Sequence, residues 1–194
     1  MRLVFASNNK HKLEEVRAIL TKHEVLSLND IGFTDDIEET GDTLQANSLI
    51  KAQAVVAFLT THPMAIDGVF SDDTGLEIDA LNGEPGVHTA RWAGEPANDA
   101  NNRRKALTLL QSKTNRKARF RTVITLIRGN KTEQVDGCVE GSIATQESGN
   151  GGFGYDPLFI PDGYDKTFAE LPAEVKNGIS HRARALQALL NLLI

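Results

Sequence analysis

Two adjacent carboxylates, Asp72 and Asp73, come where an apolar run should end at a turn that contains Gly75. Neighbouring ionised carboxylates repel one another unless water or a cation separates their charges. Mg²⁺ is the common bridge where phosphate is also present, because it prefers oxygen ligands. Glu38 and Glu39, in a polar segment before the second predicted helix, could reach the same ion. The pattern therefore indicates a magnesium site, and a solvated acidic turn is the alternative.

Asp73, Thr74 and Gly75 also spell the D-T-G sequence of aspartic proteases. In that class two carboxylates share one proton, so a single motif needs a second copy or a symmetric dimer. The aspartic protease fold is almost entirely β-structure, whereas this chain has three long amphipathic stretches. These stretches disfavour the protease interpretation.

A second candidate is the segment SNNKHK at residues 7–12, between the first predicted strand and the first predicted helix. Free amide groups and the positive end of the helix dipole favour an anion at such a junction. The ammonium groups of Lys10 and Lys12 add point charges suited to a polyphosphate. Ordinary helix capping with solvated lysines is the alternative. The spacing G-x-x-x-x-G-K-[ST] is absent, which disfavours a P-loop NTPase.

Residues 149–156, GNGGFGYD, place three glycines in the G-x-G-x-x-G spacing of dinucleotide-binding loops. That spacing has a mechanism only where the loop opens a helix, whose N-terminus holds the phosphate. Asp156 and Pro157 follow instead, and proline favours extended backbone before it, so the required helix is missing. Glycines allow close backbone approach, and Phe153 or Tyr155 on such a loop could stack on a nucleobase.

A third group of polar residues lies near the C-terminus. Lys176 is followed by Ser180, His181 and Arg182, where Ser180 is a suitable N-cap for the last predicted helix. Three donors this close together could face the carbonyl oxygen of a purine ring. Taken alone, His181 is more typical of a surface residue at a helix start.

Composition limits the classes of protein. The 194 residues carry 21 Lys and Arg against 26 Asp and Glu, a formal charge of -5, which argues against broad nucleic-acid binding. The single cysteine, Cys138, can form no internal disulfide, so a reducing compartment is expected. The N-terminal apolar run is too short for a signal peptide, and no stretch approaches the length of a membrane span. We therefore expect a cytoplasmic protein with no membrane partner.

Apolar periodicity predicts helices over about residues 9–22, 43–60, 98–112 and 180–193. It predicts strands over residues 2–6, 24–27, 64–70, 76–81, 119–127 and 133–143, the last two joined by a hairpin. Local hairpins combined with helical crossovers predict an α/β fold. We expect a single domain over residues 1–194, with a mixed, partly antiparallel central sheet, flanking helices and two lobes around a substrate cleft.

Five segments, taken together, resemble the inosine triphosphate pyrophosphatase family. They are SNNKHK, SDDTGLEIDAL, PGVHTARWAG, GGFGYDPLF and SHRARAL, which occur in this order across nearly the whole chain. The resemblance implies a homodimeric, Mg²⁺-dependent α/β enzyme with a cleft. It also implies hydrolysis of ITP, dITP and XTP to the monophosphate and pyrophosphate, which removes deaminated purines from the nucleotide pool.

The resemblance also assigns roles to residues. Asp73 corresponds to the catalytic acid and a metal ligand, Asp72 lies beside it, and Glu38 or Glu39 supplies the other metal carboxylate. The residues expected to bind the substrate are Ser7, Asn8, Asn9, Lys10, His11, Lys12 and Lys51 at the phosphates, with Thr74, and Phe153, Gly154, Tyr155, Asp156, Lys176, His181 and Arg182 at the base.

Two other functions are compatible with the same residues. One is a nucleotide pyrophosphatase that acts on a modified pyrimidine or a standard nucleoside triphosphate. The other is a nucleotide-sensing or RNA-binding module that performs no chemistry. The intact pair Asp72 and Asp73, together with the predicted phosphate-binding segment, disfavours the second.

Overall fold

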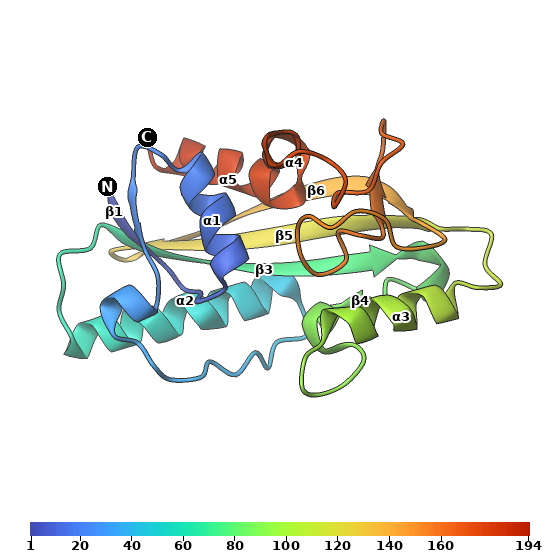
Figure 1. Cartoon of the computed structure of the whole chain (residues 1–194). Helices are drawn as coiled ribbons and strands as arrows, with labels where there is room; N and C mark the ends of the chain where they lie inside the picture. Colours follow the sequence, from blue (N-terminus) through green and yellow to red (C-terminus); the bar gives the residue numbers. More distant parts are fainter. The chain divides into compact units, whose positions relative to one another are not determined.

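The computed structural model describes residues 1–194 and contains five α-helices and seven β-strands (Figure 1). The helices are α1 (Lys10–Ile19), α2 (Leu44–Thr61), α3 (Asp99–Leu109), α4 (Ala173–Ile179) and α5 (His181–Leu192). The strands are β1 (Arg2–Phe5), β2 (Glu24–Leu26), β3 (Gly68–Ile78), β4 (Pro85–Gly86), β5 (Lys117–Arg128), β6 (Lys131–Ile143) and β7 (Phe159–Pro161). They form one sheet in the order β2-β1-β3-β5-β6-β7, with β4 paired to β3. Parallel and antiparallel pairs both occur, so the predicted mixed α/β fold with flanking helices is confirmed.

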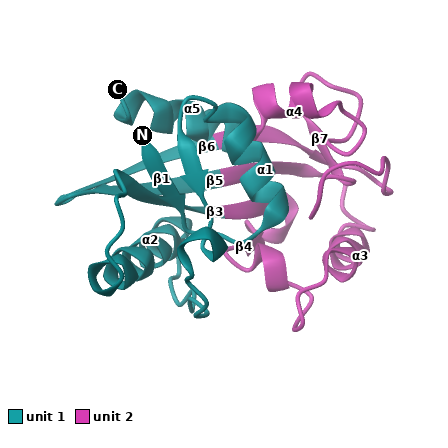
Figure 2. Ribbon diagram, turned by 60° about the vertical axis from the view of Figure 1, so that its left-hand side comes forward, with its two compact units in different colours: residues 1–73, 122–137, 182–194 teal, residues 74–121, 138–181 magenta.

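The chain divides into two compact units (Figure 2). Unit 1 comprises residues 1–73, 122–137 and 182–194, and unit 2 comprises residues 74–121 and 138–181. The boundaries fall within β3, β5 and β6, so these three strands contribute residues to both units. Each unit has buried apolar clusters made only of its own residues.

In unit 1, helices cover both faces of the parallel strands. β1 pairs in parallel with β2 and with β3. Side chains alternate along a strand, so Leu3 and Phe5 pack in a cluster with residues of α1 and α5, whereas Val4 packs in a cluster with residues of α2. A strand buried on both faces has a continuous apolar sequence, which explains the run that begins at Leu3.

Polar residues cap α1 and α2, two of the helices in unit 1 that carry candidate site residues. Asn9 caps α1, because its side-chain oxygen accepts a hydrogen bond from the Lys12 N–H at 3.1 Å. Thr43 caps α2 in the same way, through the Ala46 N–H at 3.1 Å. The caps place Lys12 in the first turn of α1 and start α2 two turns before Lys51.

Unit 2 has a separate core, to which α3, β3, β5, β6 and β7 contribute. β4 runs antiparallel to β3, and β7 runs antiparallel to β6. Phe120 and Phe159 lie at the centre of an aromatic group, with their ring centroids 4.8 Å apart. Tyr155 and Leu158 also belong to this core, so the glycine-rich segment before them is anchored at its C-terminal end.

Apart from the two-residue strand β4, the structure differs from the sequence prediction mainly in two elements. Residues 68–78 form one uninterrupted strand, β3, where two extended pieces separated by the acidic pair were expected. The short helix α4 was not predicted, because its seven residues are too few to show helical periodicity. The expected lack of a helix after residues 149–156 is confirmed, since the next regular element is β7. No helix in residues 1–194 combines the length and apolar character needed to cross a membrane.

Candidate active site

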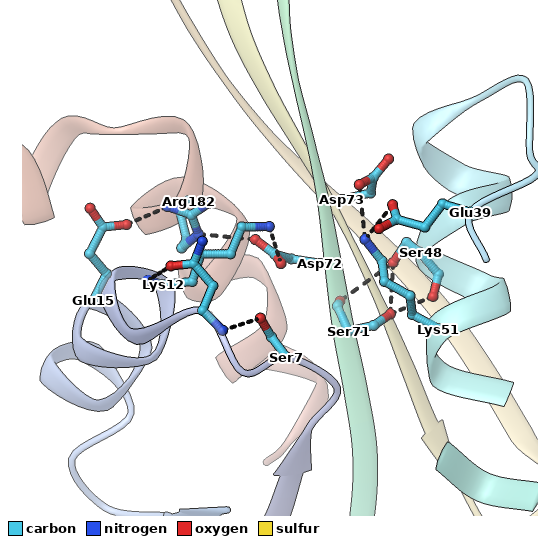
Figure 3. Close-up of polar contacts among 11 residues, drawn as sticks. Ser7, Lys12, Glu15, Glu39, Ser48, Lys51, Ser71, Asp72, Asp73 and Arg182 are labelled. Atoms are coloured by element: carbon cyan, nitrogen blue, oxygen red, sulfur yellow. Dashed lines mark hydrogen bonds and ion pairs between the residues drawn. The ribbon is translucent and has the colours of Figure 1, made fainter. Parts of the chain in front are cut away.

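The two adjacent carboxylates point to opposite faces of β3. Figure 3 shows Asp72 directed toward α1 and α5, and Asp73 directed toward α2. The alternation of side chains along a strand produces this arrangement. Both residues are buried, with 3% and 8% of their surface exposed. The pair that looks like one acidic site in the sequence therefore occupies two separate environments within unit 1.

Asp72 is fully engaged by two cations. Its Oδ1 lies 2.8 Å from Lys12 Nζ, and its Oδ2 lies 3.0 Å from Arg182 Nε. Arg182, with 2% of its side chain exposed, also donates through Nη1 to Glu15. Burial alone would raise the pKa of Asp72, but the charges of Lys12 and Arg182 hold it well below its usual range. Asp72 is therefore ionised at neutral pH and holds two cations in place.

Asp73 lies on the other face, in a group with Lys51 and Glu39. Lys51 Nζ donates to Asp73 Oδ1 and to Glu39 Oε2, both at 2.9 Å. Burial raises the pKa of Asp73 to about 6, with Lys51 opposing the rise and Glu39 adding to it. The second oxygen, Asp73 Oδ2, is buried and makes no hydrogen bond. A buried carboxylate oxygen without a partner is costly, and it is therefore suited to receive a water, a proton or a cation.

The donor set fits a magnesium ion that arrives with a phosphate ligand. Glu39 and Asp73 already converge on one cationic group, the Lys51 ammonium, and Asp73 Oδ2 is unpartnered. No group of three or more His, Cys, Asp or Glu side chains in residues 1–194 is placed to hold a metal ion. Mg²⁺ is usually bound by one or two carboxylates together with substrate phosphates and water, so two carboxylates suffice. Glu38 is exposed, and the structure does not bring it into the group around Lys51.

The segment of residues 7–12 forms the turn into α1. Ser7 Oγ accepts from the Asn9 N–H at 3.1 Å, and Asn8 Oδ1 accepts from the Asn29 N–H at 2.9 Å. Lys10 and His11 are exposed, whereas the Lys12 side chain turns inward to Asp72. The segment therefore brings one lysine into the buried charge network and leaves its neighbours at the surface.

In unit 2, the aspartate that ends the glycine-rich loop organises the loop itself. Asp156 Oδ2 accepts from the Phe153 N–H at 2.8 Å and from Lys176 Nζ at 2.7 Å. Lys176 Nζ also lies 4.9 Å from the centroid of the Phe153 ring, a cation–π distance. A Cβ atom at Gly152 would lie 2.0 Å from Asp156 Oδ2. One of the glycines is therefore needed for close approach of a carboxylate, and none of them opens a helix.

Tyr155 and His181 are both buried in unit 2. The Tyr155 hydroxyl donates to the Thr89 carbonyl at 2.9 Å, and 3% of the residue is exposed. The His181 ring stacks on Phe120 with a centroid distance of 4.6 Å. Phe153 is half-buried, so it is the aromatic side chain of the loop that keeps accessible surface.

The predicted residues thus form two sets, one in each unit. Lys12, Lys51, Asp72, Asp73 and Arg182 join Glu39 in unit 1, whereas Phe153, Gly154, Tyr155, Asp156, Lys176 and His181 lie with Thr74 in unit 2. The structure adds three residues that were not predicted. Glu15 pairs with Arg182, and Ser48 and Ser71 form a buried hydroxyl pair between α2 and β3. Two sequence signals could have found them: Glu15 follows Lys12 at helical spacing, and Ser71 alternates with Asp73 along a strand.

Comparison with known proteins extends over the whole chain. A model of the Ham1 family matches residues 3–192. A dITP/XTP pyrophosphatase of Flavobacterium johnsoniae is 49% identical over 194 residues, covering 100% of this chain and 98% of that protein. The dITP/XTP pyrophosphatase of Porphyromonas gingivalis is 50% identical over 195 residues, covering 100% and 97%. The Ham1 protein of Staphylococcus aureus, a solved structure, has a TM-score of 0.87 at 39% identity and covers 100% of this chain and 98% of that one.

Proposed function

The chain belongs to the Ham1 family, and we propose that it hydrolyses dITP, XTP and ITP to the nucleoside monophosphate and pyrophosphate. Its relatives at 49% and 50% identity carry the name dITP/XTP pyrophosphatase. The observation that carries the proposal is the environment of Asp73. One oxygen is held by Lys51, while the other is buried and has no hydrogen-bond partner. Hydrolysis of these nucleotides would remove deaminated purines before they enter DNA or RNA.

The cations of unit 1 would bind the triphosphate. Lys12, Lys51 and Arg182 lie at or beside the acidic pair, and their charges complement phosphate oxygens. The start of α1 adds the positive end of a helix dipole. Such fixed positive groups stabilise the negative charge that shifts onto the leaving pyrophosphate.

Asp73 would act as the general base. Its Oδ2, which has no hydrogen-bond partner, would accept a hydrogen bond from a water, orient that water and take up its proton. The water oxygen forms a bond to the α-phosphorus, the bond from that phosphorus to the bridging oxygen breaks, and pyrophosphate leaves. Lys51 keeps the other oxygen of Asp73 fixed during this step.

We propose that Mg²⁺ is held by Asp73 and Glu39, the two carboxylates that meet at Lys51. A bound magnesium ion would neutralise phosphate charge and help to orient the substrate. Between the two glutamates that the sequence left open, the geometry favours Glu39, because Glu39 is the one in contact with Lys51. Asp72 is less suited, since both of its oxygens already pair with cations.

The loop of unit 2 would recognise the base. Hypoxanthine and xanthine carry a 6-oxo acceptor where adenine carries an amino donor, so donors on the protein favour the oxo-purines. Lys176 is a buried donor whose position is set by Asp156. Protein donors that are left unpaired when adenine binds could discriminate against it by roughly 10²–10⁴-fold.

We propose also that the enzyme acts as a cytoplasmic homodimer and needs no nucleic-acid or membrane partner.

Product analysis tests the proposed reaction. We expect purified protein with Mg²⁺ to convert ITP, dITP and XTP to the monophosphate and pyrophosphate, and to leave ATP and GTP nearly unchanged. Ion-exchange chromatography of the products measures both the reaction and the specificity. Diphosphate and orthophosphate as products would place the attack at the terminal phosphorus, and no turnover of any substrate would favour a non-catalytic binding module.

Phe153→Ala is expected to raise KM for dITP with little change in kcat. Phe153 is half-buried on the loop of unit 2, and loss of base stacking costs on the order of 1–3 kcal/mol. Steady-state kinetics measure the effect, and Phe153→Tyr, which keeps a stacking ring, is the matched control. An unchanged KM in Phe153→Ala would exclude the stacking role.

A further inference from the structure

Helix α3 holds both polar groups of the Gly154 backbone. Asp99 Oδ2 accepts from the Gly154 N–H at 2.9 Å, and Arg103 Nη1 donates to the Gly154 carbonyl at 2.8 Å. Asp99 and Arg103 are four residues apart in α3, so they lie on one face of the helix. All three residues belong to unit 2. The helix therefore specifies the orientation of the backbone on both sides of this glycine.

The backbone conformation of Gly154 depends on contacts from outside the loop. Its φ is +61°, in the left-handed region, yet a Cβ atom there would meet nothing within 4 Å. Glycine is therefore required at this position because of its positive φ, and not because a side chain would clash. Because glycine adopts positive and negative φ with similar ease, a free loop would sample several conformations. The two contacts from α3 select one of them.

α3 itself is firmly anchored. Asn102, with 1% of its surface exposed, accepts from the Ala93 N–H at 2.7 Å and donates to the Ala90 carbonyl at 2.8 Å. Ala106 is fully buried in the core of unit 2. Arg103 is also fixed from its other side, by an ion pair with Glu147 at 3.0 Å. A helix held in this way is a rigid support for the loop.

Phe153 lies between two fixed points of the loop. Its own N–H is held by Asp156, and the next residue, Gly154, is held by Asp99 and Arg103. The backbone that carries the Phe153 ring is therefore restrained on both sides before any ligand binds. A restrained loop loses less conformational entropy on binding, so its contacts give more affinity.

From this arrangement we propose that Asp99 and Arg103 are positioning residues, which hold the loop of residues 152–156 in the conformation that binds the nucleobase. The inference rests on the proposed function, because it takes that loop to be the base-binding element. Neither side chain takes part in the reaction. Their contribution is to substrate affinity and base selectivity.

Kinetics of four variants test the proposal. Asp99→Ala and Arg103→Met each remove one contact to Gly154, and each is expected to raise KM for dITP about tenfold, the scale of a lost hydrogen bond to a charged group. The change in kcat is expected to stay within about threefold, since the groups around Asp73 are untouched. Asp99→Asn keeps an acceptor oxygen and is expected to recover most of the affinity. Arg104→Met is the matched control, because Arg104 lies on the same helix and its side chain donates to Asn101 and not to the loop.

Hydrogen exchange gives a readout that does not depend on turnover. The Gly154 amide hydrogen is bonded to Asp99, so Asp99→Ala is expected to speed its exchange, whereas Asp99→Asn and Arg104→Met are not. Normal KM values and unchanged exchange in folded Asp99→Ala and Arg103→Met would overturn the proposal. Faster exchange with an unchanged KM would also overturn it, because the loop would then not need the support. Failure of the wild type to hydrolyse dITP would instead reject the proposed function.

Discussion

Asp73→Asn is expected to lower kcat for dITP hydrolysis by at least about 10²-fold, the scale of a lost general base. An amide keeps the shape of the side chain but cannot take a proton from the attacking water. It also weakens the proposed magnesium site, which adds to the loss. The variant is expected to fold, because Lys51 retains Glu39 as an ionic partner and a neutral amide is less costly to bury than a carboxylate.

Steady-state kinetics of the purified variant measure this effect, with thermal unfolding followed in parallel to establish that it is folded. Asp36→Asn is the matched control, since Asp36 is an exposed carboxylate in the acidic segment of residues 34–42. The control is expected to keep wild-type kcat. A folded Asp73→Asn protein with wild-type kcat would remove Asp73 from the mechanism.

Asp72→Asn is expected to have its main effect on stability, with a loss of about 3–5 kcal/mol in the free energy of unfolding at pH 7. The substitution removes the carboxylate that pairs with both Lys12 and Arg182. Arg182 would keep Glu15, but Lys12 would be left without its partner at 2.8 Å. Urea unfolding without nucleotide or metal measures the loss, and Asp36→Asn again serves as the exposed control.

The difference in unfolding free energy between the wild type and Asp72→Asn is expected to become smaller as the pH falls. Lys12 and Arg182 hold the pKa of Asp72 in the folded protein well below its usual range, against the effect of burial. The ionised carboxylate therefore stabilises the fold at every pH above about 4, the ordinary pKa of an unfolded aspartate. Below that pH the wild type progressively loses the stabilisation that ionised Asp72 provides. The difference in unfolding free energy between the wild type and Asp72→Asn should therefore narrow. A gap under about 1 kcal/mol at pH 7 would show that the network is not stabilising.

Local sequence patterns were sufficient to predict most elements of the fold. The alternation and apolar runs of residues 119–127 and 133–143 correspond to β5 and β6, and the helical spacing from Leu44 to Phe58 corresponds to α2. These patterns work because periods of 2 and 3.6 residues reflect burial on one face of an element. α4 was missed since it shows too few residues of either period.

The sequence alone also predicted which residues could form the candidate site, because the relevant residue types occur in short, contiguous segments. The acidic pair, the segment of residues 7–12 and the glycine-rich loop are each readable without a structure. The lack of a helix after that loop was predictable from Pro157, which has a purely local effect on the backbone.

Only the tertiary structure decided which charges meet. Arg182 reaches Asp72 across 110 positions of sequence, and Glu39, not Glu38, contacts Lys51. It also separated residues that look alike in the sequence: Asp72 is held by two cations and Asp73 has a free oxygen, while Tyr155 is buried and Phe153 is partly exposed. Residue type and local period determine what a side chain can do, but its partners depend on how distant elements pack. That packing arises from many weak contacts summed over the whole core, which no short segment contains.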